Sequence, residues 1–564
     1  MILTRLVEFA DTQMRLPPEM YDHQPVRYLL ELSMDGTLEG VTPLGGNDRT
    51  DQRGVSFLLP HIARSNNVRA KLLADNGEYV LGLARETSRP DHVAERHRHF
   101  KDLVQTCAKV TREPAVEAVA RFLESWNPGQ DRARLPADLD PAYNVTFRVG
   151  GILPAADLPA VRDFWARHTG GEGGGPVMTC LITGQEGPVE ARLPVKIKRI
   201  PEGQTAGTAL VSANAEAFTA YGLDASLRSP ISRIAGEKFG KALNYLLATR
   251  NHHIRVGSVI YVFWTREAVD TFWMNLEQPE AASVTNLLRS PMDPSKRGDL
   301  DENAFYAMGL SASGGRAIIR DTLESTVPTA KHNIARWFED QRIVGPWGDE
   351  PRPFGLYTLT ASVFRDPAKE MLAQHSSGMF HAALHGGAPP QHLLLRALQR
   401  ARVDPNETLT HPRAALIKLI LARTGVNMTH MHELNPAPPL EGREYAAYQC
   451  GRLLAVLENV QRAALGSVNA SIVDRYYGRA SSAPASVFGP LLDRAQDHLG
   501  KLRRTRGGTY HALDARLTDI LATLPSFPKA LTVPEQGLFA LGYYHQRAAQ
   551  RAASKLPAPQ GDAQ

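Results

Sequence analysis

The side chains best placed to bind a ligand are cations and amides that gather in short polar runs. One run consists of Arg64, Ser65, Asn66, Asn67, Val68 and Arg69. An amide can pair with the acceptors that adenine and thymine present in the DNA minor groove, and arginine is favoured by the negative potential there. The same composition is typical of a polar surface turn. The run therefore predicts either a DNA-contacting loop or an exposed connection.

A second candidate is a glycine-containing turn followed by arginines. Residues 311–315 read Ser-Ala-Ser-Gly-Gly, and Arg316 and Arg320 come directly after them. Glycine lets a backbone approach a ligand closely, and guanidinium groups can reach phosphates or base edges. The alternative is an ordinary hairpin turn with exposed arginines.

Other basic groups form clusters interleaved with aromatic and histidine side chains. The net charge is +5 and the isoelectric point is about 9.0, so a polyanionic partner is possible but not required. Each cluster suits either a nucleic-acid contact or a solvated face. The clustered cations are Lys196, Lys198 and Arg199; Lys238 and Lys241; Arg250, Arg255 and Arg266; and Lys501, Arg503, Arg504 and Arg506.

The histidines do not form a recognisable catalytic or metal-binding motif. Residues 91–99 read Asp-His-Val-Ala-Glu-Arg-His-Arg-His, which differs from the HExxH order of zinc enzymes and is typical of a charged helix. His430 and His432 are typical of a loop. The sequence has no nucleophile elbow, phosphate-binding loop or paired nuclease carboxylates. We therefore expect no enzyme activity, no catalytic residues, no metal and no cofactor.

Length and composition indicate a globular protein of two to four domains. The chain has 564 residues, of which 43% are hydrophobic and 22% are charged. It has only three cysteines, which lie far apart and argue for a reducing compartment. No apolar run is long enough to span a membrane, and the first residues do not resemble a secretory signal. We expect a cytoplasmic protein with no membrane partner.

The first 320 residues mix strand and helix patterns. Residues 26–33 alternate between apolar and polar side chains and predict a half-buried strand, with a hairpin turn through 34–36. Residues 87–108 predict a helix. Residues 258–264 are continuously apolar and rich in strand-forming side chains, so they predict a buried strand.

Four helices are predicted near the C-terminus, after a proline-rich break at 435–439. The first is expected to end at Gly466, and the second to run from about residue 482 to Gly500. The third is expected to be capped by Thr509. The fourth opens with Thr532-Val-Pro-Glu, a capping box with proline inside it. Short connections favour an antiparallel bundle.

These patterns predict an α+β protein with three parts. A mixed α/β N-terminal domain covers residues 1–320, a helical connector covers 321–429, and an antiparallel four-helix bundle covers 430–564. The boundaries follow the change from mixed to helical patterns, so they carry an error of several residues.

Several blocks in a fixed order are similar to one protein family. The blocks are Met-Ile-Leu at 1–3, Asp-Asn at 75–76, Tyr-Val-Leu-Gly at 79–82, Cys-Leu-Ile-Thr-Gly at 180–184, Leu-Val-Ser-Ala-Asn at 210–214, Asn-Ala-Glu-Ala-Phe-Thr-Ala-Tyr-Gly at 214–222, Ala-Leu-Asn-Tyr-Leu-Leu at 242–247, Asn-Ala-Ser-Ile-Val-Asp-Arg-Tyr-Tyr-Gly at 469–478, and Gly-Tyr-Tyr-His-Gln-Arg at 542–547. Together they resemble the large subunit of the type I-C CRISPR RNA-guided surveillance complex, the Csd-type Cascade large subunit. We interpret 214–221 and 242–247 mainly as fold elements, in which Asn214 and Asn244 could cap or bridge internally.

The resemblance implies a non-catalytic subunit that works within an RNA-guided DNA-recognition complex. The N-terminal domain would contact the 5′ handle of the guide CRISPR RNA and recognise the short motif beside the target, the PAM, in double-stranded DNA. The region of Asn66 would take part in that recognition. The bundle would follow the displaced strand and support R-loop formation.

The resemblance also implies the partners. These are the backbone and guide-processing Cascade subunits and a helicase-nuclease that cuts the DNA. A small subunit would arise from an internal translation start within this coding sequence. Met428 and Met431 lie just before the bundle and suit that role, as does a non-AUG start near Val426. The alternatives are a stand-alone metal-dependent nuclease and a general RNA-binding scaffold.

Overall fold

The computed structural model describes most of the chain as two compact units. The described residues are 2–45, 53–62, 68–171, 176–213, 216–269, 276, 279–280, 283, 303–404, 408–466 and 470–555. Unit 1 comprises residues 3–197 and 209–242, and unit 2 comprises 198–208 and 243–564. The division falls within α7 (Arg233–Ala248). The roles predicted for the segments 1–320, 321–429 and 430–564 remain predictions.

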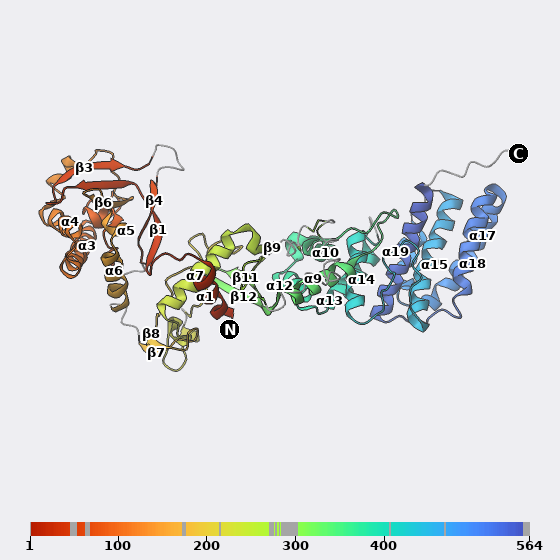
Figure 1. Cartoon of the computed structure of the whole chain (residues 1–564). Coiled ribbons are helices and arrows are strands. Elements are labelled where there is room, and N and C mark those ends of the chain that lie inside the picture. The colour runs from red at the N-terminus through yellow and green to blue at the C-terminus, as the bar shows by residue number, and fades with distance from the viewer. Residues whose placement is uncertain are drawn as a thin grey trace. The chain divides into compact units, whose positions relative to one another are not determined.

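Unit 1 combines small sheets with helices (Figure 1). Its strands are β1 (Tyr21–Val26), β2 (Tyr28–Leu32), β3 (Leu38–Pro43), β4 (Val55–Pro60), β5 (Ala74–Asn76), β6 (Asn144–Val149), β7 (Val177–Thr179) and β8 (Glu186–Pro188). Its helices are α1 (Ile2–Gln13), α2 (Gly77–Val80), α3 (Pro90–Thr111), α4 (Pro114–Ser125), α5 (Pro154–Asp157) and α6 (Pro159–Gly171), with 3-10 turns η1 (Asp131–Arg134), η2 (Glu216–Phe218) and η3 (Ala225–Arg228).

The main sheet of unit 1 has the strand order β3-β2-β6-β5, in which β2 and β6 run parallel. The predicted hairpin through residues 34–36 joins β2 to β3 and is confirmed. Gly36 has φ +92°, and Arg121 of α4 donates to the carbonyl oxygen of Met34 at 2.7 Å. The strand predicted to be half-buried differs in one respect. Leu29 and Leu30 are both fully buried, because β2 lies inside the sheet and α4 covers it.

Unit 2 begins with an antiparallel sheet and continues as helices. The strands are β9 (His253–Val256), β10 (Val259–Thr265), β11 (Ala304–Ser313) and β12 (Arg316–Thr326), in the order β12-β11-β10-β9. The helices are α9 (Val327–Gln341), α10 (Leu356–Ala361), α11 (Pro367–Glu370), α12 (Ala373–His385), α13 (His392–Val403), α14 (His411–Arg423), α15 (Gly442–Leu465), α16 (Ile472–Ala480), α17 (Phe488–Thr505), α18 (Gly507–Ala522) and α19 (Val533–Lys555), with 3-10 turns η4 (Arg250–His252) and η8 (Pro484–Ser486). The fold is α+β, as predicted.

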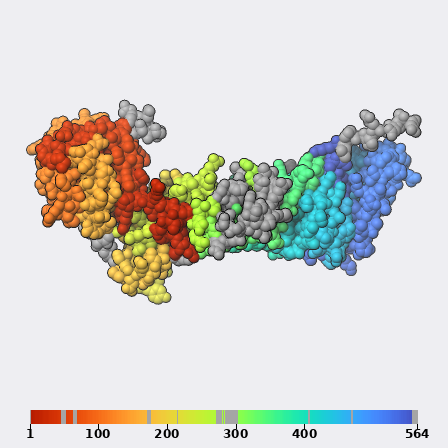
Figure 2. All heavy atoms as spheres, in the orientation of Figure 1, coloured from red at the N-terminus to blue at the C-terminus, as the bar shows by residue number. Residues whose placement is uncertain are grey.

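One hydrophobic core runs through unit 2 from the sheet to the last helix. All seven residues of β10 are buried, which confirms the strand predicted at 258–264. Figure 2 shows the green, cyan and blue segments packed against one another without a gap. Met428 and Met431 belong to this core, and Met431 is fully buried. The segment before the bundle is therefore packed against its neighbours.

Two of the helix ends predicted in the bundle are confirmed. The C-cap of α15 is Gly466, and Thr532 and Glu535 form the predicted capping box at the start of α19. The predicted end of the second helix at Gly500 is wrong, because α17 continues to Thr505. Leu502 is buried in that extension and stabilises it. The third helix begins at Gly507, two residues before the predicted Thr509.

Helices α15 and α19 approach each other closely at two glycines. A Cβ atom on Gly451 would overlap the carbonyl oxygen of Phe539, and a Cβ atom on Gly542 would overlap that of Tyr448. Each glycine therefore faces the backbone of the other helix. Any side chain at these positions would force the two axes apart.

Among the described residues, no helix has the length and apolar character needed to cross a bilayer.

Gly542→Ala should lower the free energy of unfolding by about 1–3 kcal/mol or more, because the added methyl group overpacks the contact. Gly500→Ala is the matched control, since Gly500 lies in α17 with open space around its Cβ position. That change should instead stabilise the helix by about 0.5–1 kcal/mol. Chemical denaturation followed by circular dichroism measures both. Equal effects of the two substitutions would contradict the close approach.

Candidate nucleic-acid interface

A basic groove lies on the bundle between α15, α16 and α17. It encloses about 290 Å³, and none of its described lining residues is acidic. Its polar lining consists of Gln461, Arg475, Tyr476, Arg494 and His498. Arg494 donates a hydrogen bond to the hydroxyl oxygen of Tyr476 at 3.2 Å. Guanidinium groups beside a tyrosine ring can bind a phosphate and stack on a base.

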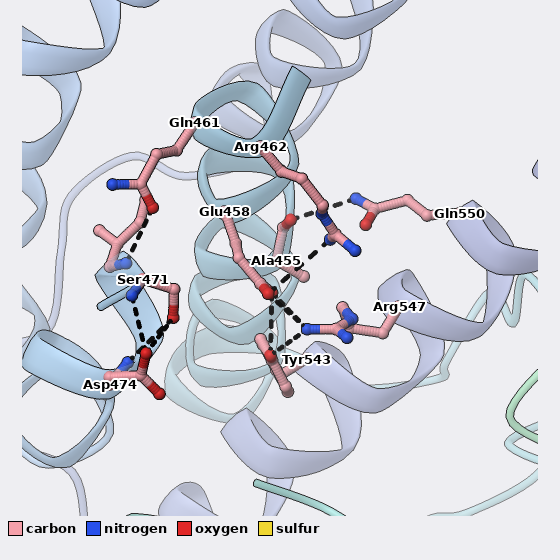
Figure 3. A network of polar contacts seen from close by, with 10 residues as sticks. Ala455, Glu458, Gln461, Arg462, Ser471, Asp474, Tyr543, Arg547 and Gln550 are labelled. Carbon is pink, nitrogen blue, oxygen red and sulfur yellow. Dashed lines mark hydrogen bonds and ion pairs between the residues drawn. The ribbon is translucent and has the colours of Figure 1, made fainter. Parts of the chain in front are cut away.

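The orientation of α16 in this groove is fixed by capping contacts (Figure 3). The Asp474 carboxylate accepts from the backbone N–H of Ser471 at 2.7 Å, and Ser471 Oγ accepts from the N–H of Asp474 at 3.2 Å. Gln461 of α15 accepts from the N–H of Ile472 at 3.0 Å. These bonds satisfy donors at the first turn of α16 and tie it to α15. They fix the helix turn that carries Arg475 and Tyr476.

The groove continues along α17 as a basic stripe. Arg494, His498 and Lys501 are spaced i, i+4 and i+7, which places them on one helical face, and the exposed Asp497 borders that face. The buried Leu491 and Ala495 of α17 line the groove beside Arg494. The predicted cluster then completes the stripe at the junction of α17 and α18. All four of its members, Lys501, Arg503, Arg504 and Arg506, are exposed.

Between α15 and α19, the block at 542–547 contributes Tyr543 and Arg547 to a partly buried polar network (Figure 3). Glu458 of α15 accepts from Arg547 at 2.6 Å and from the hydroxyl of Tyr543 at 2.9 Å. Burial, together with the charge of Glu458, raises the pKa of Tyr543. Its hydroxyl therefore stays protonated and acts as a hydrogen-bond donor that links α19 to α15.

His545 completes the internal network from the same helix. Its Nε2 lies 3.1 Å from the carbonyl oxygen of Met431, and its Nδ1 lies 3.1 Å from the hydroxyl of Tyr448. Full burial lowers the pKa of His545 to about 3, so the ring is neutral. Because a carbonyl only accepts, Nε2 carries the proton and Nδ1 accepts from Tyr448. Both ring nitrogens are used within the protein.

Unit 1 has a cavity of about 420 Å³ beside the predicted DNA-contacting run. Arg64, Ser65, Asn66 and Asn67 lie outside the described residues. Arg69 is described, is exposed, and lines this cavity together with His99 of α3 and His168 of α6. Ile62, Val68 and Asp102 line it as well.

The block at Asp75 and Asn76 forms stabilising hydrogen bonds elsewhere in unit 1. The Asp75 carboxylate is buried and accepts from the N–H of Lys71 at 3.0 Å. Asn76 caps α2. Glu78 follows, and burial alone would raise its pKa. Hydrogen bonds from Arg85 and Ser88, with the charges of Arg85 and Arg96, lower that pKa to about 2. Glu78 thus anchors α2 to α3.

The remaining predicted cations have different environments. Lys196 is exposed and lines a cavity of about 660 Å³ together with residues 210–213 of a resemblance block. The Lys198 side chain is exposed, and its backbone N–H donates to Asn244 Oδ1 at 2.8 Å, which confirms that Asn244 bridges internally. Lys241 is half-buried. Its ammonium donates to the carbonyl oxygen of Tyr21 at 3.0 Å and pairs with Glu237.

The glycine turn at 311–316 is a hairpin between β11 and β12. Ser313 pairs with Arg316, and Gly314 has φ +58°. Arg320 is exposed, and its Nε donates to Ser311 Oγ at 2.7 Å. Arg316 is half-buried. Both arginines therefore lie on β12, and Arg320 is the more exposed of the two.

A further candidate is Tyr221, at the tip of a small turn in unit 1. Ala220 and Leu223 pair across the turn, and Tyr221 and Gly222 have φ +55° and +71°. Positive φ is unusual for an aromatic residue and strains the backbone. The Tyr221 side chain is also 100% exposed. An exposed aromatic ring at a strained turn can serve as a recognition residue, and the interpretation of 214–221 as mainly a fold element stays a prediction.

The structure brings some predicted residues together and adds others. Lys501, Arg503, Arg504 and Arg506 are all exposed around the end of α17, and Arg316 and Arg320 share one strand. The sequence analysis missed the groove residues, although the block at 469–478 contained two of them, Arg475 and Tyr476. The i, i+4, i+7 spacing from Arg494 to Lys501 was a readable signal.

Two comparisons bear on identity. Residues 3–551 match the family model described as CRISPR-associated protein (Cas_Csd1). A search of curated proteins gave no match to the chain.

Tyr221→Gly should weaken binding and leave the fold at least as stable. Removing the ring should lose about 1–3 kcal/mol of stacking on a base, whereas glycine relieves about 1 kcal/mol of left-handed strain. Fluorescence anisotropy with labelled DNA measures the first effect and thermal melting the second.

Val177→Ala is the control for that change, since Val177 is also exposed, at 72%, but lies in the regular strand β7. It should leave the affinity unaltered. If Tyr221→Gly also leaves the affinity unaltered, the ring has no part in binding.

Proposed function

The chain belongs to the CRISPR-associated Csd1 family, and we propose that it is the non-catalytic subunit that recognises target DNA in a type I-C RNA-guided surveillance complex. The observation that carries this proposal is the extent of the family match, from residue 3 to residue 551. It covers both compact units, so the proposal concerns the whole chain. In such complexes base pairing with the guide reads the target sequence, and protein reads a short duplex motif.

Unit 1 is the part that we assign to the duplex motif and to the guide handle. The cavity lined by Arg69, His99 and His168 supports this assignment, because Arg69 belongs to the polar run 64–69. Asn66 would contact base edges in the minor groove, and Arg69 would contact the phosphate backbone beside it. Tyr221 would stack on an unpaired or terminal base.

Unit 2 is the part that we assign to the displaced strand. The groove with Arg475, Tyr476 and Arg494 supports this assignment, and so does the stripe that ends at Lys501 and Arg504. A positively charged path with an aromatic ring binds single strands with little sequence preference. Such contacts would hold the displaced strand and so support R-loop formation.

A binding role fits the distribution of polar groups better than a stand-alone nuclease does. In the described part of the bundle, the half-buried Glu458 and Arg547 pair with each other, and the buried His545 bonds to the Met431 carbonyl and the Tyr448 hydroxyl. Cleavage would then come from a separate helicase-nuclease that the complex recruits. A general RNA-binding scaffold is the other alternative. It would bind RNA without dependence on a duplex motif.

Reconstitution with the companion subunits tests this function. We expect the guide RNA to co-purify with the complex, and binding to a matched target to require the motif. Omitting this chain should abolish the preference for the motif. Intrinsic DNA cleavage by the purified chain, tracking with its elution peak in magnesium or manganese, would favour the nuclease instead.

Changing Lys501, Arg503, Arg504 and Arg506 to Gln should weaken binding to every target and flatten its salt dependence. Each lost contact to a single strand should reduce the slope of log affinity against log salt by about 0.7. Lys529→Gln serves as a control for one exposed charge in the loop before α19. A slope that is unaltered by the fourfold change would place the displaced strand elsewhere.

The small subunit provides a separate prediction. A product that starts at Met431 has 134 residues and a mass of roughly 15 kDa, in proportion to 61.9 kDa for the whole chain. It keeps the Met431 carbonyl that binds His545 but loses α13 and α14, which pack on α19. We therefore expect it within the assembled complex, where a partner can cover that face of α19.

Intact-mass analysis of the native coding sequence, expressed with its companions, detects this product. Met428→Leu combined with Met431→Leu should remove it, while the similar volume of leucine keeps the core filled. Persistence of the product in the double variant would place the start elsewhere, such as at Val426. Its absence from a fully assembled wild-type complex would show that the chain works without a free small subunit.

A further inference from the structure

Three potential metal ligands meet on the surface of unit 2, where the sheet packs against a helix. Asp321 lies on β12, and His381 and His385 lie on α12. Nδ1 of His381 is 3.0 Å from Oδ1 of Asp321, and Nε2 of His385 is 3.7 Å from the same oxygen. One ligand atom from each residue lies within 4.8 Å of the other two.

The fold holds the three side chains in register. The two histidines are spaced i and i+4, so they project from one face of α12. Next to His381 in α12, Phe380 stacks on Tyr261 of β10 with ring centroids 3.6 Å apart, which packs the helix on the sheet. The end of α12 is fixed as well, because Asn333 of α9 donates to the carbonyl oxygen of Leu384 at 2.7 Å. The position of the ligands is therefore set by packing, rather than by loops.

Two of the three distances between ligand atoms are near those of a tetrahedral zinc site. Zinc bonds of about 2.0–2.2 Å to imidazole nitrogen and carboxylate oxygen place neighbouring ligand atoms about 3.3–3.5 Å apart. The two measured distances, 3.0 and 3.7 Å, lie on either side of this value. The imidazole rings stack with centroids 3.9 Å apart and planes inclined by 19°. Stacked rings direct their nitrogen lone pairs nearly parallel, so metal binding requires at least one ring to rotate out of the stack.

We propose that Asp321, His381 and His385 bind one divalent transition-metal ion of the zinc class. Two imidazoles and one carboxylate are a ligand set that Zn²⁺ prefers, and three protein ligands leave a fourth position open. His381 is 54% exposed, so the open position faces solvent and takes water or an anionic oxygen ligand. The ion joins β12 to α12 and so clamps the sheet to the helical part of unit 2. This site stands independently of the proposed nucleic-acid role.

The sequence analysis overlooked this site for a physical reason. It considered histidines that lie close together in sequence, at 91–99 and 430–432. Here the carboxylate is 60 residues from the first histidine, and only the packing of α12 on the sheet joins them. The spacing of His381 and His385 alone is common on exposed helices.

The test uses the untagged full-length chain, stripped with a chelator and titrated with Co²⁺ and then with Zn²⁺. We expect one equivalent of Co²⁺ to bind with the strong visible absorption of a tetrahedral site, and Zn²⁺ to displace it. His385→Gln and Asp321→Asn should each weaken binding by more than about 100-fold, because changes to outer partners alone cost about 10–100-fold. Zn²⁺ should raise the melting temperature of the wild type and not of these variants.

Two further variants separate a metal site from a simple ion pair. His381→Gln keeps a hydrogen-bond donor for Asp321, so it should preserve the fold of the stripped protein while losing metal binding. His332→Gln removes an exposed histidine from α9 and should change neither property. Binding that persists in His385→Gln and Asp321→Asn, or the lack of any Co²⁺ spectrum in the wild type, would overturn the proposal.

Discussion

The close approach of α15 and α19 is the contact on which the organisation of unit 2 depends. Gly451 and Gly542 each face the backbone of the opposite helix, and no other residue type fits there. Because the axes are so near, Glu458 can reach Tyr543 and Arg547, and His545 can reach Tyr448 and the Met431 carbonyl. The same helix α19 packs on α13 and α14, so the core continues from the bundle toward the sheet. With α15 and α19 packed together at the centre of the bundle, charged side chains lie on the outer faces of α16 and α17.

The charged groups of the bundle are therefore of two kinds: those paired within the protein and those on its outer surface. The half-buried Glu458 and Arg547 pair with each other, and both ring nitrogens of the buried His545 are bonded within the protein. The groove on the outer face carries Arg475, Tyr476 and Arg494, groups of the kind that can bind phosphates and stack on bases. Unit 1 has a different kind of surface, in which Arg69 and two histidines line a cavity at the ends of a polar run. We assign these two surfaces, in the proposal, to the two tasks that an RNA-guided complex leaves to protein, namely reading a short duplex motif and holding a single strand.

Signals within a few consecutive residues correctly predicted the helix ends and the turn that depend only on those residues. The capping box at Thr532, the C-cap at Gly466 and the hairpin at Gly36 are signals contained in a few residues, and the structure confirms them. The end predicted at Gly500 failed because burial of Leu502 outweighs the low helix propensity of one glycine. The basic groove and the Asp321 site depend on packing between helices and strands that are distant in sequence. Periodicity within one segment carries no information on such contacts. The family blocks identified the protein, yet most of their side chains in 542–547 proved to face inward.

The central claim is that the duplex motif is read by unit 1 and that the displaced strand is held by the bundle. Site-specific photo-crosslinking of an assembled R-loop, with the crosslinked peptides identified by mass spectrometry, tests it most directly. A probe in the displaced strand should label peptides that contain Arg475, Arg494 or Lys501, and a probe at the duplex motif should label peptides within residues 62–70. Displaced-strand crosslinks confined to unit 1, or motif crosslinks on the bundle, would contradict the account.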